Sequence, residues 1–205
     1  MPVVRNGGDT LVPMPTAAER PWIEAGYGMF ALHGPDGLKV EQLARQVGIS
    51  KSSFYHHFAD VPVFIEQLQA YHLQRADALA SKADACTSFD PGFIQLLVEH
   101  RIDLLFQRQL RMLRDHTAFQ RCFEEAHQRV VDRIMPRWAE ALGIPGQLAP
   151  ARDMLQVVTD VFYQRLTNDN LSYTWMVELL KEIESFIRHA MRSQGSISGL
   201  STGQS

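Results

Sequence analysis

Residues 39–60 read KVEQLARQVGISKSSFYHHFAD and contain the clearest structural pattern in the chain. Val40, Leu43 and Val47 recur at the i, i+3 and i+7 positions that form the apolar side of a short amphipathic helix. Gly48 follows where a helix commonly ends in a left-handed residue, a conformation that glycine adopts without steric cost. The pattern therefore predicts a short helix that ends at this glycine.

A second short helix is predicted directly after the glycine. Ser50 stands where a side chain can cap the free N–H groups of a first helical turn. Phe54 and Phe58, four residues apart, would hold this helix against the core. The opposite face carries hydrogen-bonding side chains: Lys51, Ser52, Tyr55 and His56.

Two short helices joined at a glycine, the second with polar groups on its outer face, are typical of a helix-turn-helix that reads DNA in the major groove. The alternative is a helical hairpin buried inside an all-helical protein. The outer face favours the first interpretation, because a buried helix would not carry a lysine, a serine, a tyrosine and a histidine without partners.

The same segment resembles the signature of tetracycline-repressor (TetR-like) regulators. The resemblance covers about residues 16–64 and includes the upstream sequence WIEAGYGMFALHG. It implies an N-terminal three-helix DNA-binding domain, followed by a larger helical domain that binds small molecules and dimerises. The matching residues are Ala25, Phe30, Gly34, Val40, Leu43, Ala44, Gly48, Ile49, Ser50, Phe54, Tyr55, His57 and Phe58.

The chain departs from the family signature at three places. Lys39 replaces the threonine or serine that usually starts the second helix, so a phosphate partner is kept and a cap is lost. Ser52 and Ser53 replace the usual Gly-Thr pair and retain a hydroxyl. Asp-Val-Pro at 60–62 replaces the lysine that usually opens the fourth helix and contacts the DNA backbone.

The side chains expected to contact DNA lie on or beside the second short helix. The Lys51 amine can donate to guanine or to phosphate, and Ser52 and His56 can reach base edges. The resemblance implies that Ser53 and Tyr55 hold the phosphate backbone, which positions a protein without reading sequence. The full set of candidates is Lys39, Lys51, Ser52, Ser53, Tyr55 and His56.

The composition is that of a globular protein with a sizeable core: 205 residues, 45% hydrophobic and 21% charged. The net charge is −3, and the first 62 residues carry five basic and six acidic side chains. The chain therefore lacks a broad positive field for nucleic acid. A DNA-binding function would depend on the local placement of basic groups and on two copies per site.

The sequence predicts a cytoplasmic protein. No run of about 18 apolar residues is present, so we expect no membrane span. The first residues, MPVVRNGGDTLVPMP, lack the apolar segment of a secretory signal. Cys86 and Cys122 form no C-x-x-C pair, which fits a reducing compartment.

We expect an all-α protein in four parts. These are a flexible arm at 1–15, a helix-turn-helix domain at 16–60, a helical effector-binding and dimerisation domain at 61–193, and a disordered tail at 194–205. The helices expected in the third part span 61–85, 93–106, 108–115, 119–141, 150–168 and 172–192.

Helix ends and breaks are indicated by a few residues. Pro21 predicts that the first helix either kinks there or begins near Arg20. Asp60 and Asp90 can cap the helices that follow them. Pro136 predicts an interruption in the helix at 119–141, because proline cannot donate the backbone hydrogen bond.

The last two helices predict a homodimer. Both carry apolar stripes wider than the roughly 100° that one core contact needs, so each helix can pack on its own domain and on a partner subunit. The alternative is a fully interior helical pair. The expected interface residues are Val158, Val161, Phe162, Trp175, Leu179, Ile183 and Phe186.

Effector binding is implied mainly by the family resemblance. Aromatic residues around Pro136 predict a domain that packs unevenly, and apolar pockets between helices of a bundle are common ligand sites. The competing outcome is a solid core without a cavity. The candidate contacts for a small, partly apolar molecule are His100, Phe106, Phe123, His127, Trp138 and Phe162.

We expect neither catalysis nor a cofactor. The chain lacks G-x-S-x-G, P-loop, G-x-G-x-x-G and H-E-x-x-H motifs. Glu124-x-x-His127 is one half of a di-metal pattern whose second half is missing. His72, His100, His116 and His127 could approach one another inside a helical bundle and bind a metal, but scattered histidines are usually satisfied individually. A solvated helix face and individually satisfied histidines explain these residues without a metal.

Together these patterns predict a sequence-specific transcriptional regulator. It would be a repressor that binds a palindromic double-stranded DNA operator as a homodimer, and that a small-molecule effector releases. The alternative is a ligand-binding protein of the TetR fold without specific DNA recognition.

Overall fold

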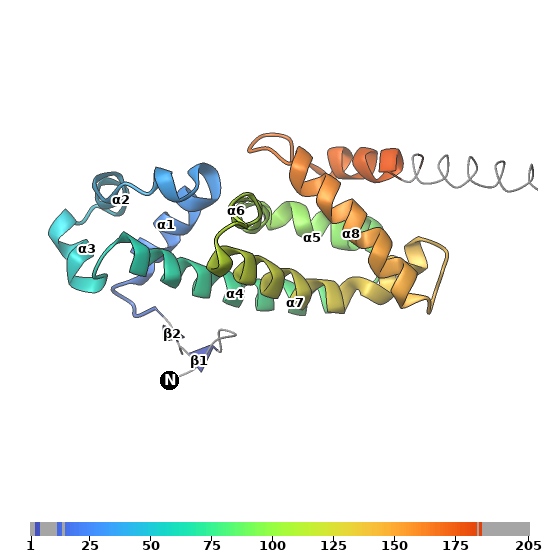
Figure 1. Ribbon diagram of the computed structural model, residues 1–205, viewed down its shortest axis with the longest axis horizontal. Helices are drawn as coiled ribbons and strands as arrows, with labels where there is room; N and C mark the ends of the chain where they lie inside the picture. Colours follow the sequence, from blue (N-terminus) through green and yellow to red (C-terminus); the bar gives the residue numbers. More distant parts are fainter. Residues whose placement is uncertain (1–2, 5–11, 14, 184, 186–205) are drawn as a thin grey trace, which may run out of the picture.

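The computed structural model describes residues 3–4, 12–13, 15–183 and 185. Two short strands, β1 (Val3–Val4) and β2 (Val12–Pro13), pair antiparallel near the N-terminus. Every other regular element in the described ranges is helical (Figure 1). The expected all-α class is confirmed.

The N-terminal part contains α1 (Arg20–His33), the 3₁₀ turn η1 (Pro35–Gly37), α2 (Val40–Val47) and α3 (Lys51–His57). Helix α1 begins at Arg20, with proline in its first turn, where a missing N–H is tolerated. A reciprocal pair of hydrogen bonds between Thr16 and Glu19 closes the turn before it, with Thr16 N–H donating over 2.8 Å and Glu19 N–H over 3.3 Å.

The turn between α2 and α3 has the expected glycine geometry. Gly48 has a φ of 77° and donates its N–H to the Ala44 carbonyl. Ser50 precedes α3 as expected, but its hydroxyl lies 2.9 Å from the Ser52 hydroxyl and caps no backbone N–H. The predicted Ser50 cap is therefore wrong, because a neighbouring side chain takes its hydrogen bond.

Helices α4 (Val61–Asp84) and α6 (Arg101–Met112) connect the N-terminal part to the rest of the molecule. Helix α4 is capped by Asp60, which accepts a hydrogen bond of 2.8 Å from the Val63 N–H. It lies along α7 (Thr117–Ala141), while α1 packs on α6 (Figure 1). Helices α4 and α6 therefore both join the two parts.

The helices after α4 begin and end at other residues than the sequence predicts. A π-helical turn η2 (Phe89–Phe93) leads into α5 (Ile94–Glu99), and the backbone at His100 separates α5 from α6. The cap of η2 is Ser88, whose hydroxyl accepts from the Gly92 N–H, whereas Asp90 accepts from the Tyr173 hydroxyl at 2.7 Å. The expected separate helix at 108–115 is instead the end of α6 and the turn after it.

The remaining helices fit the predicted pattern more closely. Helix α7 runs from Thr117 to Ala141 without the expected interruption at Pro136. It is followed by α8 (Leu148–Arg165) and a last described helical segment at 173–183. No described helix combines the length and the apolar character needed to cross a membrane.

Gly26 provides a test of the packing between α1 and α4. A Cβ at this position would stand 2.4 Å from the ring of Phe64, which is fully buried. We expect Gly26→Ala to lower the free energy of unfolding by about 1–3 kcal/mol, because the ring must move.

Gly28→Ala is the matched control, since a Cβ added there would meet no atom within 4 Å outside its own helix backbone. It should raise stability by up to about 1 kcal/mol through helix propensity. Similar effects of both variants in urea unfolding would contradict this packing.

Candidate nucleic-acid interface and internal cavity

Helix α3 is two-sided, as the sequence predicts. Phe54 and Phe58 are 0% and 3% exposed. Tyr55 is 49% exposed on the opposite side. The other predicted DNA contacts are also at the surface: Lys39, Lys51, Ser52 and His56 are exposed, and Ser53 is half-buried.

An aromatic cluster holds α3 in place. The Phe54 ring packs edge-on against Trp22 of α1 at 5.6 Å and against Phe64 of α4 at 5.1 Å between ring centroids. Phe58 also packs on Phe64, at 4.7 Å. Such aromatic pairs contribute stability beyond their burial. The position of α3 is therefore fixed by the helices before and after it.

Lys51 is already engaged on this surface. Its ammonium pairs with the Glu41 carboxylate of α2, and both side chains are exposed. The hydrogen bond between them lowers the pKa of Glu41 and raises the pKa of Lys51. A phosphate or a base edge must compete with Glu41 for this lysine.

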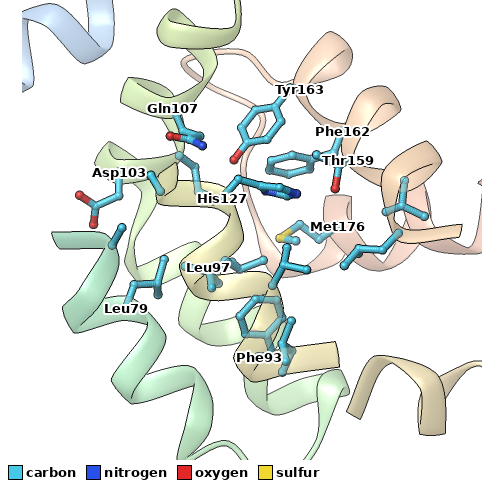
Figure 2. A pocket seen from close by; sticks show the side chains of 18 of the residues that line it. Leu79, Phe93, Leu97, Asp103, Gln107, His127, Thr159, Phe162, Tyr163 and Met176 are labelled. Carbon is cyan, nitrogen blue, oxygen red and sulfur yellow. The ribbon is translucent and has the colours of Figure 1, made fainter. Parts of the chain in front are cut away.

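A cavity of about 120 Å³ lies in the larger domain (Figure 2). Its walls come from α4, η2, α5, α6, α7, α8 and the helix at 173–183, and most are apolar side chains. Two of the predicted effector contacts, His127 and Phe162, line it. The expectation of a cavity, rather than a solid core, agrees with the structure.

The other four predicted effector contacts lie outside the cavity lining. Phe106 is fully buried and stacks on Tyr27 at 4.4 Å. Phe123 stacks on the His127 ring from behind, at 5.7 Å. The Trp138 Nε1–H donates to the Ala151 carbonyl over 2.8 Å. The Nδ1 atom of His100 lies within hydrogen-bond distance of Asp103 Oδ2, at 2.8 Å.

Two polar lining residues, Thr159 and Tyr163 of α8, were not among the predicted effector contacts. They are four residues apart and therefore share one helix face. Their spacing is visible in the sequence and could have indicated a polar patch facing a cavity. The apolar residues around them, however, predict a dimer contact equally well. The sequence pattern does not separate these two uses.

A buried hydrogen-bonded network connects the cavity wall to α1. The Tyr27 hydroxyl donates to Asp103 Oδ1 over 2.8 Å and lies 2.7 Å from His72 Nδ1. The Gln107 amide donates to the Phe123 carbonyl over 2.7 Å, which directs its oxygen toward His72 Nε2, 2.6 Å away. Because His72, Asp103 and Gln107 also line the cavity, the network reaches from the cavity to α1 in the N-terminal part.

Burial and charge determine the protonation of this network. Burial lowers the pKa of His72 to about 4, against the hydrogen bond to Gln107, which alone would raise it. The neutral ring carries one N–H and can donate it to the Tyr27 oxygen or to the Gln107 oxygen, not to both. Burial alone would raise the pKa of Asp103, but hydrogen bonds from Arg75 and Tyr27 bring it below its usual value. Arg75 donates Nη2–H to Asp103 Oδ2 over 2.9 Å and pairs with the other oxygen through Nε. The carboxylate is therefore ionised and fully engaged.

The predicted dimer residues are mostly buried within the single chain. Phe162 and Leu179 are 8% and 4% exposed, and Val158 and Ile183 are also buried. Val161 and Trp175 are half-buried. Phe186 lies outside the described residues. The interior-pair alternative thus accounts for four of the seven positions, because these side chains face the cavity and core.

An apolar row remains on the outer side of α8. Met154, Val157 and Val161 follow the i, i+3 and i+7 spacing of one helix face. Val157 is 48% exposed and the other two are half-buried. This row, together with Leu148 at 46% exposure, is the exposed apolar surface of α8.

The described residues contain no group of three or more histidine, cysteine, aspartate or glutamate side chains that could hold a metal ion. Glu124 accepts a hydrogen bond from Gln120 on the surface of α7, whereas His127 faces the cavity. Cys86 and Cys122 are free thiols.

Comparison with known proteins agrees with this architecture. Residues 23–60 match the profile of the family described as bacterial regulatory proteins, tetR family. No curated protein sequence matches the chain.

Similar folds occur among solved structures at low sequence identity. A putative TetR-family transcriptional regulator from Rhodococcus sp. has a TM-score of 0.55 and 21% identity, over 83% of this chain and 98% of that one. A transcriptional regulator (TerR/AcrR family) from Aquifex aeolicus VF5 has a TM-score of 0.56 and 15% identity, over 83% and 99%. Salmonella enterica GusR has a TM-score of 0.56 and 13% identity, over 86% and 98%.

The sequence resemblance is therefore confirmed. Residues 23–60 match the tetR-family profile, and the chain as a whole shares the fold of solved structures described as TetR-family regulators.

The buried histidines predict an acid-sensitive fold. Burial lowers the pKa of both His72 and His127 from 6.5 to about 4. The unfolded chain therefore binds more protons than the folded chain between these values, and stability falls as the pH drops through that window. Each histidine should lower the free energy of unfolding by about 2 kcal/mol between about pH 7 and about pH 5. Urea unfolding at both pH values tests this, and a pH dependence unchanged in His127→Asn would contradict it.

The hydrogen-bonded network predicts energetic coupling across the domain junction. Tyr27→Phe and Gln107→Met should be non-additive in the free energy of unfolding by at least about 0.5 kcal/mol, because both act on His72. Tyr173→Phe with Gln107→Met is the control pair, since the Tyr173 hydroxyl donates to Asp90 and shares no partner with Gln107. Additivity in both pairs would show that the network does not couple the two parts.

Proposed function

We propose that the protein is a cytoplasmic, homodimeric transcriptional regulator that represses its target by inserting α3 into the major groove of a palindromic operator. The observation that carries this proposal is the exposed face of α3, with an amine, hydroxyls, a phenol and an imidazole, held by buried Phe54 and Phe58 in a tetR-family segment. A helix mounted in this way presents its side chains to a groove wide enough to admit it.

The roles of the surface residues follow from their chemistry. Lys51, Ser52 and His56 would read base edges or phosphate, and Tyr55 and Ser53 would hold the backbone. Lys39 lies exposed at the start of α2, where it can reach a phosphate. Because the domain has no net positive charge, each cation matters more and specific binding requires two subunits.

The second subunit would pack on the outer row of α8. Met154, Val157 and Val161 supply an apolar strip, and a two-fold axis would bring the same strip from each subunit together. This arrangement keeps the buried positions on the inner side of α8 for the cavity. It therefore supports a homodimer in which Met154, Val157 and Val161 of α8 form the contact, whereas the sequence predicted Val158, Val161 and Phe162.

Release by an effector would act through the cavity and the network. A ligand can shift an equilibrium only when it binds two conformations differently. Gln107, His72 and Asp103 contact both the cavity and the network that reaches Tyr27 of α1. A ligand that displaces these side chains would favour a different placement of α1 and α4, and with them of α3.

The test is a DNA-protection assay on the DNA upstream of the chain's own gene. Wild type should protect two half-sites about one helical turn or more apart. Lys51→Ala and Tyr55→Ala should each weaken binding by about tenfold or more, because a contact of this kind contributes about 1–3 kcal/mol. Lys51→Ala should also reduce the salt dependence of binding, since each subunit loses a cation.

Two further variants control for net charge. Lys181→Ala removes the same charge from an exposed position on the last helix and should leave DNA affinity unchanged. Glu41→Gln removes the competitor of the Lys51 amine and should strengthen binding. Equal binding by wild type, Lys51→Ala and Tyr55→Ala would refute the proposed reading surface.

The second candidate function is a ligand-binding protein of this fold without specific DNA recognition. Two observations favour it. The first 62 residues carry more acidic than basic side chains. Asp-Val-Pro at 60–62, with Asp60 as the cap of α4, stands where the family signature has a lysine that contacts DNA. Salt separates the two functions, because the affinity of a true DNA reader falls steeply as salt is added.

A further inference from the structure

Four polar side chains of the cavity lie toward one end. Gln107, His127, Thr159 and Tyr163 lie together there, while Leu79, Leu97 and Phe93 form the other end (Figure 2). Gln107 is engaged by His72 and the Phe123 carbonyl. The other three polar side chains form a small hydrogen-bonding surface, which we call the polar end.

The side chains of the polar end have no hydrogen-bond partner among the described residues. Tyr163 and Thr159 are only 8% and 7% exposed, so water that satisfies their hydroxyls must come from the cavity. The Tyr163 hydroxyl is directed into the cavity toward the His127 ring (Figure 2). A buried polar group without a partner is costly, and the cavity is the place from which a partner can reach it.

The polar end carries no formal charge near neutral pH. Burial and the neighbouring Arg111 lower the pKa of His127 to about 4, so its ring is neutral and keeps one donor and one acceptor. Burial raises the pKa of the Tyr163 hydroxyl. Among the described lining residues, Asp103 is the only acidic or basic side chain besides histidine, and Arg75, Tyr27 and His100 engage it.

An ionic ligand would therefore find no free countercharge in the lining. Moving an ion from water into an apolar site without a counterion costs far more than a neutral hydrogen-bonding group does. The volume of about 120 Å³ sets the size, since a dry apolar cavity of about 150 Å³ holds a benzene molecule. The occupant is thus comparable to one small ring.

We infer that this cavity binds an uncharged molecule of about one aromatic ring in size, with a hydroxyl or carbonyl group that pairs with Tyr163, Thr159 and His127. The apolar body lies against the leucine and phenylalanine side chains at the other end. The inference rests on the proposed function only in giving this ligand the role of effector, because binding to the cavity does not depend on DNA.

The experiment compares four probes of similar size by calorimetric titration of the full chain near neutral pH. The probes are neutral 4-ethylphenol, anionic 4-ethylbenzoate, cationic 4-methylbenzylammonium, and ethylbenzene, which has no hydrogen-bonding group. We expect 4-ethylphenol to bind at least about tenfold more tightly than either ion, because the ions lose their hydration without a countercharge. Binding of either ion as tight as that of 4-ethylphenol, or no binding of 4-ethylphenol, would overturn the inference.

Two variants test whether 4-ethylphenol binds at the polar end. Tyr163→Phe and Thr159→Val keep the side-chain shape and remove a hydroxyl, and each should weaken 4-ethylphenol binding about threefold to tenfold. Neither should weaken ethylbenzene binding. Tyr173→Phe is the control, since that hydroxyl donates to Asp90 and Tyr173 is not a lining residue. Unchanged 4-ethylphenol affinity in both cavity variants would refute the assigned contacts.

The outcome is independent of the DNA-protection assay. If 4-ethylphenol binds as expected but the chain protects no DNA, the proposed regulatory function fails and the ligand class stands. If DNA is protected and the probes show no preference for the neutral molecule, the ligand class fails alone.

Discussion

A buried carboxylate, that of Asp103, constrains the junction between the two parts of the molecule. It is 4% exposed, and a charge so deeply buried is tolerated only when it is paired and hydrogen-bonded. Its partners come from different helices: Tyr27 from α1, Arg75 from α4, and His100 at the start of α6. The requirement to satisfy one carboxylate therefore fixes three helices relative to one another, and two of them support the surface proposed to meet DNA.

The aromatic cluster extends this constraint to α3. Phe54 packs against Trp22 of α1 and Phe64 of α4, so α3 follows these two helices and has little independent freedom. The cavity lies on the other side of the same junction, where His72, Asp103 and Gln107 line it. In the proposed regulator, a ligand need not act over a long distance, because its cavity shares side chains with the network that positions α1.

Much of the helix-turn-helix part could be predicted because its signals are local. The left-handed Gly48, the cap at Asp60 and the two-sided helix at 51–57 each depend on side chains a few residues apart. The least accurate local predictions were caps and breaks. Ser50 and Asp90 have the chemistry of a cap, but nearby side chains, Ser52 and Tyr173, take their hydrogen bonds. A capping residue can be recognised from sequence, whereas its competitors are known only once the chain is folded.

The sequence by itself determined the all-α class, the helix-turn-helix and the residues on its outer face, since helical periodicity places those residues without reference to the rest of the chain. The tertiary structure alone decided which apolar residues of α8 and the last helix line a cavity and which face outward. It also decided that His72 and Asp103 form hydrogen bonds with Tyr27, which lies 45 and 76 positions away in the chain, and that Gln107 joins them through His72. An apolar stripe is the same pattern whether it covers a core, a cavity or a partner, and only the packing of distant helices distinguishes these uses.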